Sequence, residues 1–162
     1  MPERPVVVGM ISRALLLLVV SRGHGWHDTA DRAVERFAGL YSSPGMKVLD
    51  VGGRMVTGGA RKYFESRQCK FVCLDMEADP SVDVVVPPGE RFPFIDGFFD
   101  LVVTTSTFEH DPMFWMTIRE MARVLRVGGF MYVNAPSAGY WHGYPDDNYR
   151  FYRGAAAALA FW

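Results

Sequence analysis

The chain has 162 residues, a length that suits one domain. Hydrophobic residues make up 49% and charged residues 22%, so the chain can bury a core and is not intrinsically disordered. Its formal net charge is −1 and it shows no basic stripe, which argues against a nucleic-acid partner.

An apolar stretch at residues 6–20 is interrupted by Gly9 and Arg13. A membrane-spanning helix needs about 20 apolar residues, so this stretch is too short for one. A secretory signal remains an alternative, although the residues that follow make a poor cleavage site. We expect a helix packed on the domain, or an irregular leader, within residues 1–26, and a single domain over residues 27–162.

The cysteines Cys69 and Cys73 lie in or beside one predicted strand. At about 3.3 Å per residue they would be about 13 Å apart, too far for a disulfide. Two buried thiols fit a reducing compartment, and we expect a cytoplasmic protein.

The first predicted helix covers residues 28–41, where apolar side chains recur at helical spacing and Asp28 can cap the start. A short apolar run at residues 46–51 predicts a buried strand. A glycine-rich turn at residues 52–59 and a short helix at residues 60–66 follow.

The second strand is predicted at residues 70–75 and the third at residues 82–86. Parallel strands usually need a crossover of a dozen or more residues, and the segment between these two is much shorter. The usual crossover helix must therefore be missing, and the third strand must be short or irregular.

The fourth strand is predicted at residues 98–104, where the apolar run is nearly continuous. Asp111 would cap a helix over residues 111–126, which Gly128-Gly129 would close, and the fifth strand would cover residues 130–135. Alternating strands and helices predict an α/β protein with a mostly parallel sheet of about five strands.

A candidate cofactor site lies where the first two strands end. Asp50 could accept a hydrogen bond from an ammonium group, and Gly52 and Gly53 allow a ligand to approach the backbone. Asp75 follows Gly53 at nearly the spacing of an acid that binds ribose hydroxyls. Arg54 replaces the second glycine of G-x-G-x-x-G, which argues against a nicotinamide-linked oxidoreductase. A ligand-free glycine loop is the alternative.

Candidate catalytic groups follow the last two strands. His110, His142 and Asp147 could act as general bases. The segment 140–152 mixes aromatic rings with Asp, Asn and Arg, which suits a sugar or another polyol, although a lid held by its own aromatic core is an equal alternative. We expect no metal site, because sequence neighbours such as residues 109–111 rarely converge on one ion.

Several ordered motifs add to this interpretation. They are Val-Leu-Asp-Val-Gly-Gly-Arg at 48–54, Leu-Asp-Met-Glu at 74–77, Arg-Phe-Pro-Phe at 91–94, Phe-Phe-Asp-Leu-Val-Val at 98–103, Glu-His at 109–110 and Glu-Met-Ala-Arg-Val-Leu-Arg-Val-Gly-Gly at 120–129. Over about residues 45–160 the chain resembles class I S-adenosylmethionine-dependent methyltransferases, which have a Rossmann-like three-layer fold. It is most similar to a subgroup whose first motif contains Gly-Ser-Arg.

The resemblance implies S-adenosylmethionine as cofactor and an enzyme that methylates a hydroxyl of a sugar or small metabolite. It implies that the loop 87–92 lies along the adenine. With the residues named above, the predicted cofactor site comprises Asp50, Gly52, Gly53, Arg54, Asp75, Met76, Thr104, Thr105 and Ser106.

The resemblance also implies a C-terminal β-hairpin, which the sequence after the fifth strand does not supply. The fifth strand would then present an open apolar edge, which favours pairing with a second copy of the chain. A catalytically inactive cofactor-binding or interaction module is the alternative function.

Overall fold

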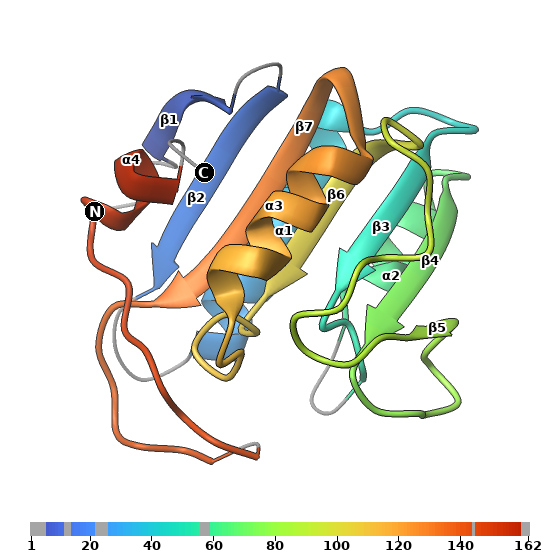
Figure 1. Cartoon of the computed structure of the whole chain (residues 1–162). Coiled ribbons are helices and arrows are strands. Elements are labelled where there is room, and N and C mark those ends of the chain that lie inside the picture. Colours follow the sequence, from blue (N-terminus) through green and yellow to red (C-terminus); the bar gives the residue numbers. More distant parts are fainter. Residues whose placement is uncertain (1–5, 12–13, 22–25, 56–58, 144, 160–162) are drawn as a thin grey trace.

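The computed structural model describes residues 6–11, 14–21, 26–55, 59–143 and 145–159 (Figure 1). The strands are β1 (Val6–Ile11), β2 (Ala14–Ser21), β3 (Lys47–Val51), β4 (Lys70–Asp75), β5 (Val84–Val85), β6 (Phe99–Thr105) and β7 (Leu125–Pro136). The helices are α1 (Trp26–Tyr41), α2 (Arg61–Glu65), α3 (Phe114–Val124) and α4 (Ala155–Leu159).

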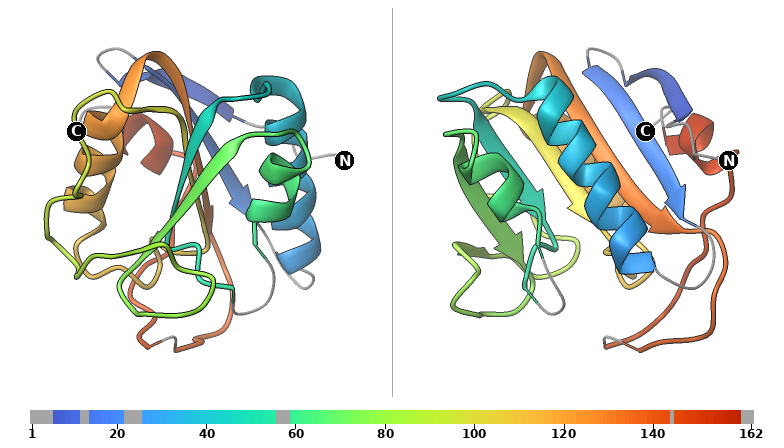
Figure 2. Two further views of the ribbon diagram at one scale, coloured as in Figure 1. Left: turned by 90° about the vertical axis from the view of Figure 1, so that its right-hand side faces the viewer. Right: turned by 180° about the vertical axis from the view of Figure 1, so that it is seen from behind.

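The described strands form one sheet in the order β1-β2-β7-β6-β3-β4-β5. Neighbours from β2 to β5 are parallel, and β1 is antiparallel to β2. Helices α1 and α2 cover one face and α3 covers the other (Figures 1 and 2). The predicted α/β class, the Rossmann-like three layers and the five predicted strands are confirmed.

Each face of the sheet buries its own core. Between the sheet and α1, Phe37 packs on Tyr132 with ring centroids 5.0 Å apart. Beneath α3, Ile118 and Met121 are buried against strand residues such as Met131. Burial on both faces explains why the central strands have nearly continuous apolar sequences.

The connection from β4 to β5 runs without a helix, as the short spacing predicted. Asp83, just before β5, extends the pairing with β4, because its backbone N–H donates to the Cys73 carbonyl at 2.9 Å. Its carboxylate accepts from the Cys73 N–H at 2.8 Å. Strand β5 therefore needs only Val84–Val85 to join the sheet.

Helix α3 is shorter than its sequence pattern predicts. The Asp111 carboxylate accepts from the Met113 N–H at 2.8 Å, so it closes the turn before the helix rather than the helix itself. Leu125 already pairs with Phe99 as the first residue of β7, so the prediction that the helix continues to residue 126 is wrong. Gly129 belongs to the strand, where an added Cβ would lie 2.7 Å from the Asp100 carbonyl oxygen.

The expectation of a helix or irregular leader near the N-terminus is also wrong. Strands β1 and β2 form a hairpin, and β2 pairs with β7 from Leu15↔Phe130 to Ser21↔Pro136. The edge of β7 is thus covered within the chain, which removes the basis for the predicted pairing with a second copy. Backbone hydrogen bonding to the open edge of β7 stabilises the leucine-rich segment as a strand by more than its intrinsic helix propensity would stabilise a helix.

Cys69 and Cys73 are buried free thiols, as predicted. Burial raises the pKa of Cys73 to about 12. Within the described ranges, no helix is both long and apolar enough to cross a bilayer.

Candidate active site

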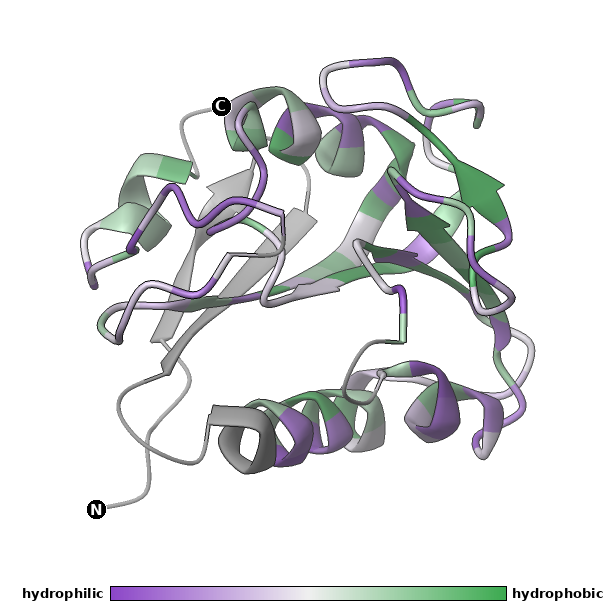
Figure 3. Cartoon of the chain, turned by 90° about the horizontal axis from the view of Figure 1, so that it is seen from below, coloured by the Kyte–Doolittle hydropathy of each residue, from purple (hydrophilic) through white to green (hydrophobic). Residues whose placement is uncertain are grey.

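A cleft of about 970 Å³ lies at the carboxyl ends of the parallel strands. Figure 3 looks towards these ends, with α3 on one side of the sheet and α1 and α2 on the other. Its lining residues come from the loops after β3, β4, β5, β6 and β7, from the strand residues next to those loops and from the helix residues Ala30, Asp31, Val34 and Thr117. Its volume is at the upper end of the range for small-molecule sites, about 300–1,000 Å³.

The glycine turn after β3 forms part of the cleft wall. Gly52 has a φ of +73° and its N–H donates to the Leu74 carbonyl at 2.8 Å, which ties the turn to β4. A Cβ added to Gly53 would lie 2.5 Å from Oδ2 of Asp50. Glycine at this position therefore lets the backbone pass directly over the Asp50 carboxyl group.

Asp50 is the second-to-last residue of β3 and lines the cleft, although it is only 2% exposed. Its Oδ1 atom has no hydrogen-bond partner among the described residues. The pKa of this carboxyl group is raised to about 7, because burial, with a smaller contribution from Asp75, raises it by more than Arg61 lowers it. A cationic donor in the cleft would satisfy the oxygen and stabilise its charged form.

Asp75 ends β4 and faces the same cleft. Its carboxylate accepts from the backbone N–H groups of Glu77, at 3.1 Å, and Arg54, at 3.3 Å. The Arg54 guanidinium group pairs with Glu77 and lies 4.0 Å from Asp75. These contacts hold the Asp75 carboxylate at the strand end.

The other predicted cofactor residues divide into two groups. Met76, Thr105 and Ser106 line the cleft, whereas Thr104 is fully buried and is not part of the lining. Sequence reasoning missed Thr107. Its hydroxyl donates to the carbonyl of Val51, the last residue of β3, at 3.3 Å. No motif singles out this residue, because its role depends on the neighbouring strand.

At the opposite end of the cleft, the loop after β7 brings Tyr140, Trp141 and His142 into the lining. Tyr140 is 85% exposed and Trp141 74%, so both rings can present a face to a ligand. Backbone contacts bind this loop to the loop after β6: the Glu109 carbonyl accepts from the Asn148 N–H at 2.7 Å. The segment is therefore held against the sheet end by main-chain hydrogen bonds.

Asp147 was predicted as a base, but it does not line the cleft, whereas His142 does. Asp147 therefore cannot face a ligand as His142 can. Its carboxylate accepts from Arg150 Nη2 at 2.6 Å and from the His142 N–H at 2.9 Å. Its Oδ2 lies 3.3 Å from His142 Nδ1. The hydrogen bonds from Arg150 lower the pKa of Asp147 to about 2. Asp147 is thus an ionised group that orients the His142 ring.

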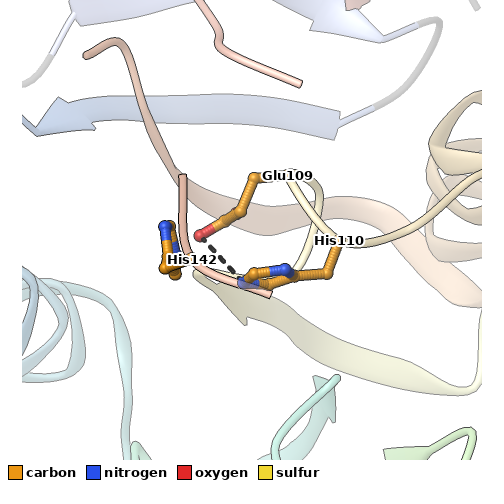
Figure 4. A group of neighbouring side chains, drawn as sticks. All are labelled: Glu109, His110 and His142. Carbon is orange, nitrogen blue, oxygen red and sulfur yellow. Dashed lines mark ion pairs between the residues drawn. The ribbon is translucent and has the colours of Figure 1, made fainter. Parts of the chain in front are cut away.

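Glu109 is the main residue at this end that sequence reasoning did not select as a site residue. Its side chain is fully buried, and burial raises its pKa to about 7. Its Oε1 lies 3.8 Å from His110 Nε2. The His110 and His142 rings are perpendicular, with centroids 5.0 Å apart, and the three side chains point toward one another (Figure 4).

Comparison with known proteins agrees with this geometry. A family model described as a methyltransferase domain matches residues 46–133, more than half of the chain. Sarcosine/dimethylglycine N-methyltransferase from Halorhodospira halochloris is 32% identical over 63% of this chain and 42% of its own length. A chloroplastic 2-methyl-6-phytyl-1,4-hydroquinone methyltransferase from Oryza sativa subsp. japonica is 30% identical over 68% of this chain and 36% of its own.

Among solved structures, Burkholderia thailandensis 1,6-didemethyltoxoflavin-N1-methyltransferase superposes with a TM-score of 0.62 at 18% identity. The match covers 83% of this chain and 70% of that one, whose crystal contains 1,6-didemethyltoxoflavin and S-adenosylhomocysteine. This likeness shows a shared fold. The chain spans less than half the length of the curated relatives named above.

Proposed function

The chain belongs to the methyltransferase domain family, and from that premise we propose that it transfers a methyl group from S-adenosylmethionine to a hydroxyl of a sugar or another small polyol. The observation that carries the proposal is one continuous cleft. It contains the two strand-end acids Asp50 and Asp75 at one end and exposed aromatic rings beside two imidazoles at the other.

The residues at the first end fit the cofactor. The buried Asp50 oxygen without a partner suits the ammonium group, and the missing Cβ of Gly53 leaves room beside it. Asp75, held by backbone N–H groups, suits the ribose hydroxyls. When bound, the cofactor supplies an activated methyl group, and the protein supplies orientation.

The residues at the second end suit a polyol acceptor. The exposed faces of Tyr140 and Trp141 can pack on the apolar face of a sugar ring. His110 and His142 line the cleft, which supports a role for them in the loss of a hydroxyl proton, and the 3.3 Å contact of Asp147 with His142 Nδ1 supports a role for Asp147 in orienting that ring. Asp147 is therefore a positioning residue in this proposal.

Calorimetry with S-adenosylmethionine and S-adenosylhomocysteine tests the cofactor half of the proposal. We expect micromolar binding by the full chain, loss of binding in Asp75→Ala and no change in Glu35→Ala, which removes an exposed acid of α1 outside the cleft lining. A folded chain that binds neither compound would contradict the cofactor assignment.

A labelled-methyl assay with a panel of acceptors tests the second half. The panel contains sugars and polyols, the amines sarcosine and dimethylglycine, and a hydroquinone. The amines and the hydroquinone are included because the names of two relatives contain them. We expect transfer to a hydroxyl of a sugar or polyol. Transfer confined to amines or to the hydroquinone would overturn the hydroxyl assignment, and binding without transfer would overturn the activity.

A further inference from the structure

Glu109, His110 and His142 form a compact group of potential metal ligands. One ligand atom from each residue lies within 4.8 Å of the other two (Figure 4). Two imidazoles and one carboxylate are a donor set typical of catalytic zinc sites that keep a position open for another ligand. His110 and His142 both line the cleft, so such an open position would face the proposed acceptor.

The hydrogen bonds behind the rings favour the tautomer that binds a metal through Nε2. His110 Nδ1 lies 2.5 Å from the Asp146 carbonyl oxygen, which can only accept, so Nδ1 carries the hydrogen. His142 Nδ1 lies 3.2 Å from the Tyr140 carbonyl oxygen and 3.3 Å from the Asp147 carboxylate. Histidine ligands of metals usually donate their other N–H to a carbonyl or carboxylate in this way.

Glu109 provides an independent indication. Its side chain is fully buried, and neither carboxylate oxygen has a hydrogen-bond partner in the part of the chain that the structure describes. A buried carboxyl group without such partners is costly unless a cation or a proton compensates it. A metal ion between Glu109 and the two rings would accept a lone pair from each imidazole and would balance the negative charge of the Glu109 carboxylate.

We propose that Glu109, His110 and His142 bind one divalent transition-metal ion of the zinc type, which holds the acceptor oxygen in the cleft. Ligands about 2.1 Å from a tetrahedral ion lie about 3.4 Å apart, so separations of up to 4.8 Å in the group must shorten by as much as about 1.4 Å on binding. A hydroxyl oxygen bound to the ion loses its proton to water more readily, and the negative charge on oxygen is stabilised by the metal. With the ion bound, His110 and His142 assist this proton loss as metal ligands and not as bases. The role of the ion in holding an acceptor rests on the proposed function, whereas metal binding itself does not.

Metal binding is measured on the full, untagged chain after treatment with a chelator and desalting. We expect Co²⁺ to bind at about one equivalent with visible absorption bands, and Zn²⁺ to displace it. His110→Ala and His142→Ala should each weaken binding by about 100-fold or more, and Asp147→Asn by about tenfold. Glu35→Ala, which removes an exposed acid of α1 outside the group, should bind as the parent chain does.

Glu109→Gln probes the carboxylate, and a thermal melt reports whether this buried substitution still folds. Since the rings lie at the cleft, His142→Ala remains informative if Glu109→Gln unfolds. No binding of Co²⁺ or Zn²⁺ by the folded parent chain would overturn the site, as would equal binding by the parent, His110→Ala and His142→Ala.

A chelator then separates the site from the proposed function. We expect methyl transfer to fall in chelator and to return with Zn²⁺ or Co²⁺, while the affinity for S-adenosylhomocysteine stays unchanged. Undiminished transfer by demonstrably metal-free protein would overturn the role of the ion in holding the acceptor. A chain that binds the metal at this group yet transfers no methyl would refute the proposed activity and leave the metal site standing.

Discussion

Asp50 and Gly53 at one end of the cleft lie three residues apart, at the end of β3 and in the turn that follows it, whereas His110 and His142 at the other end come from loops far apart in the sequence. The turn is fixed by backbone geometry and by the Gly52–Leu74 hydrogen bond. The second end is assembled by contacts such as that between His110 and the Asp146 carbonyl, 36 residues apart. Cofactor binding at the first end should therefore be lost through local changes in the turn. Acceptor binding at the second end should be lost when contacts between the loops are removed.

The largest expected effect is the loss of cofactor binding in Asp75→Ala. Hydrogen bonds to a charged group are worth about 1.5–3 kcal/mol each, so losing two of them predicts a loss of affinity of more than about 100-fold. Calorimetry measures the change. An affinity within about threefold of the parent chain, with the fold intact, would show that the strand-end acid does not bind the cofactor.

Gly53→Ala should weaken cofactor binding by about 5- to 150-fold, because strain of about 1–3 kcal/mol follows when a side chain is forced into a packed site. The added Cβ would lie 2.5 Å from Asp50 Oδ2 and 3.0 Å from Cys73 Sγ. The turn must shift, and Asp50 with it. Calorimetry and a thermal melt measure the two consequences.

Gly39→Ala is the matched control for this substitution. Gly39 lies within α1 and an added Cβ meets nothing within 4 Å. Alanine is more favourable than glycine in a helix by about 0.5–1 kcal/mol, so this variant should melt at a slightly higher temperature with unchanged affinity. If both variants lost affinity equally, the close approach at Gly53 would not be the cause.

These two ends also differ in how much of them the sequence reveals. Asp50 and Asp75 lie at the ends of predicted strands and Gly53 follows the first of them, so the rule that parallel strands present their carboxyl ends at one edge is enough to bring them together. The approach of His142 to Glu109 depends on loop–loop hydrogen bonds, such as that from the Asn148 N–H to the Glu109 carbonyl, which no periodicity encodes.

The same distinction explains the errors in the fold. The short strand β5 was predictable because chain length alone rules out a crossover helix. The β1–β2 hairpin was not, because a run of leucines is compatible with a helix until the open edge of β7 is considered. Thr104 was expected at the cofactor, but it is buried in β6, a strand covered on both faces, and does not line the cleft, and Thr107 was missed beyond the strand end.

The pH dependence of Asp50 provides a prediction of intermediate size. Its folded pKa of about 7 exceeds the ordinary value of 3.8, so between these values the folded chain binds more protons than the unfolded chain. This contribution to stability is fully present below the ordinary value and is lost as the pH rises through about 7. Melts of the parent chain and Asp50→Asn at several pH values should therefore coincide in acid, diverge as the pH rises from about 4 to about 7 and keep a constant difference above it, with the variant the more stable.

Cofactor affinity should have the opposite dependence on pH. An ammonium group binds the Asp50 carboxylate and not the neutral acid, so affinity should rise by up to about tenfold per pH unit below neutrality and level off above it. Asp50→Asn should bind weakly with a flat profile. Parallel profiles for the parent chain and the variant would assign the titration to another group.

The smallest expected effect, and the one that tests the independence of the two ends, belongs to Asn148→Ala. Its side-chain amide donates to the His110 carbonyl at 3.1 Å and helps to hold the acceptor loop. A hydrogen bond of this kind contributes about 1 kcal/mol, so KM for the acceptor should rise about fivefold. The affinity for S-adenosylhomocysteine should stay within about twofold, because no contact of Asn148 reaches the glycine turn in the described part of the chain. If both constants changed together, the loops and the turn would act as one cooperative unit, and the division of the cleft into separately held ends would be wrong.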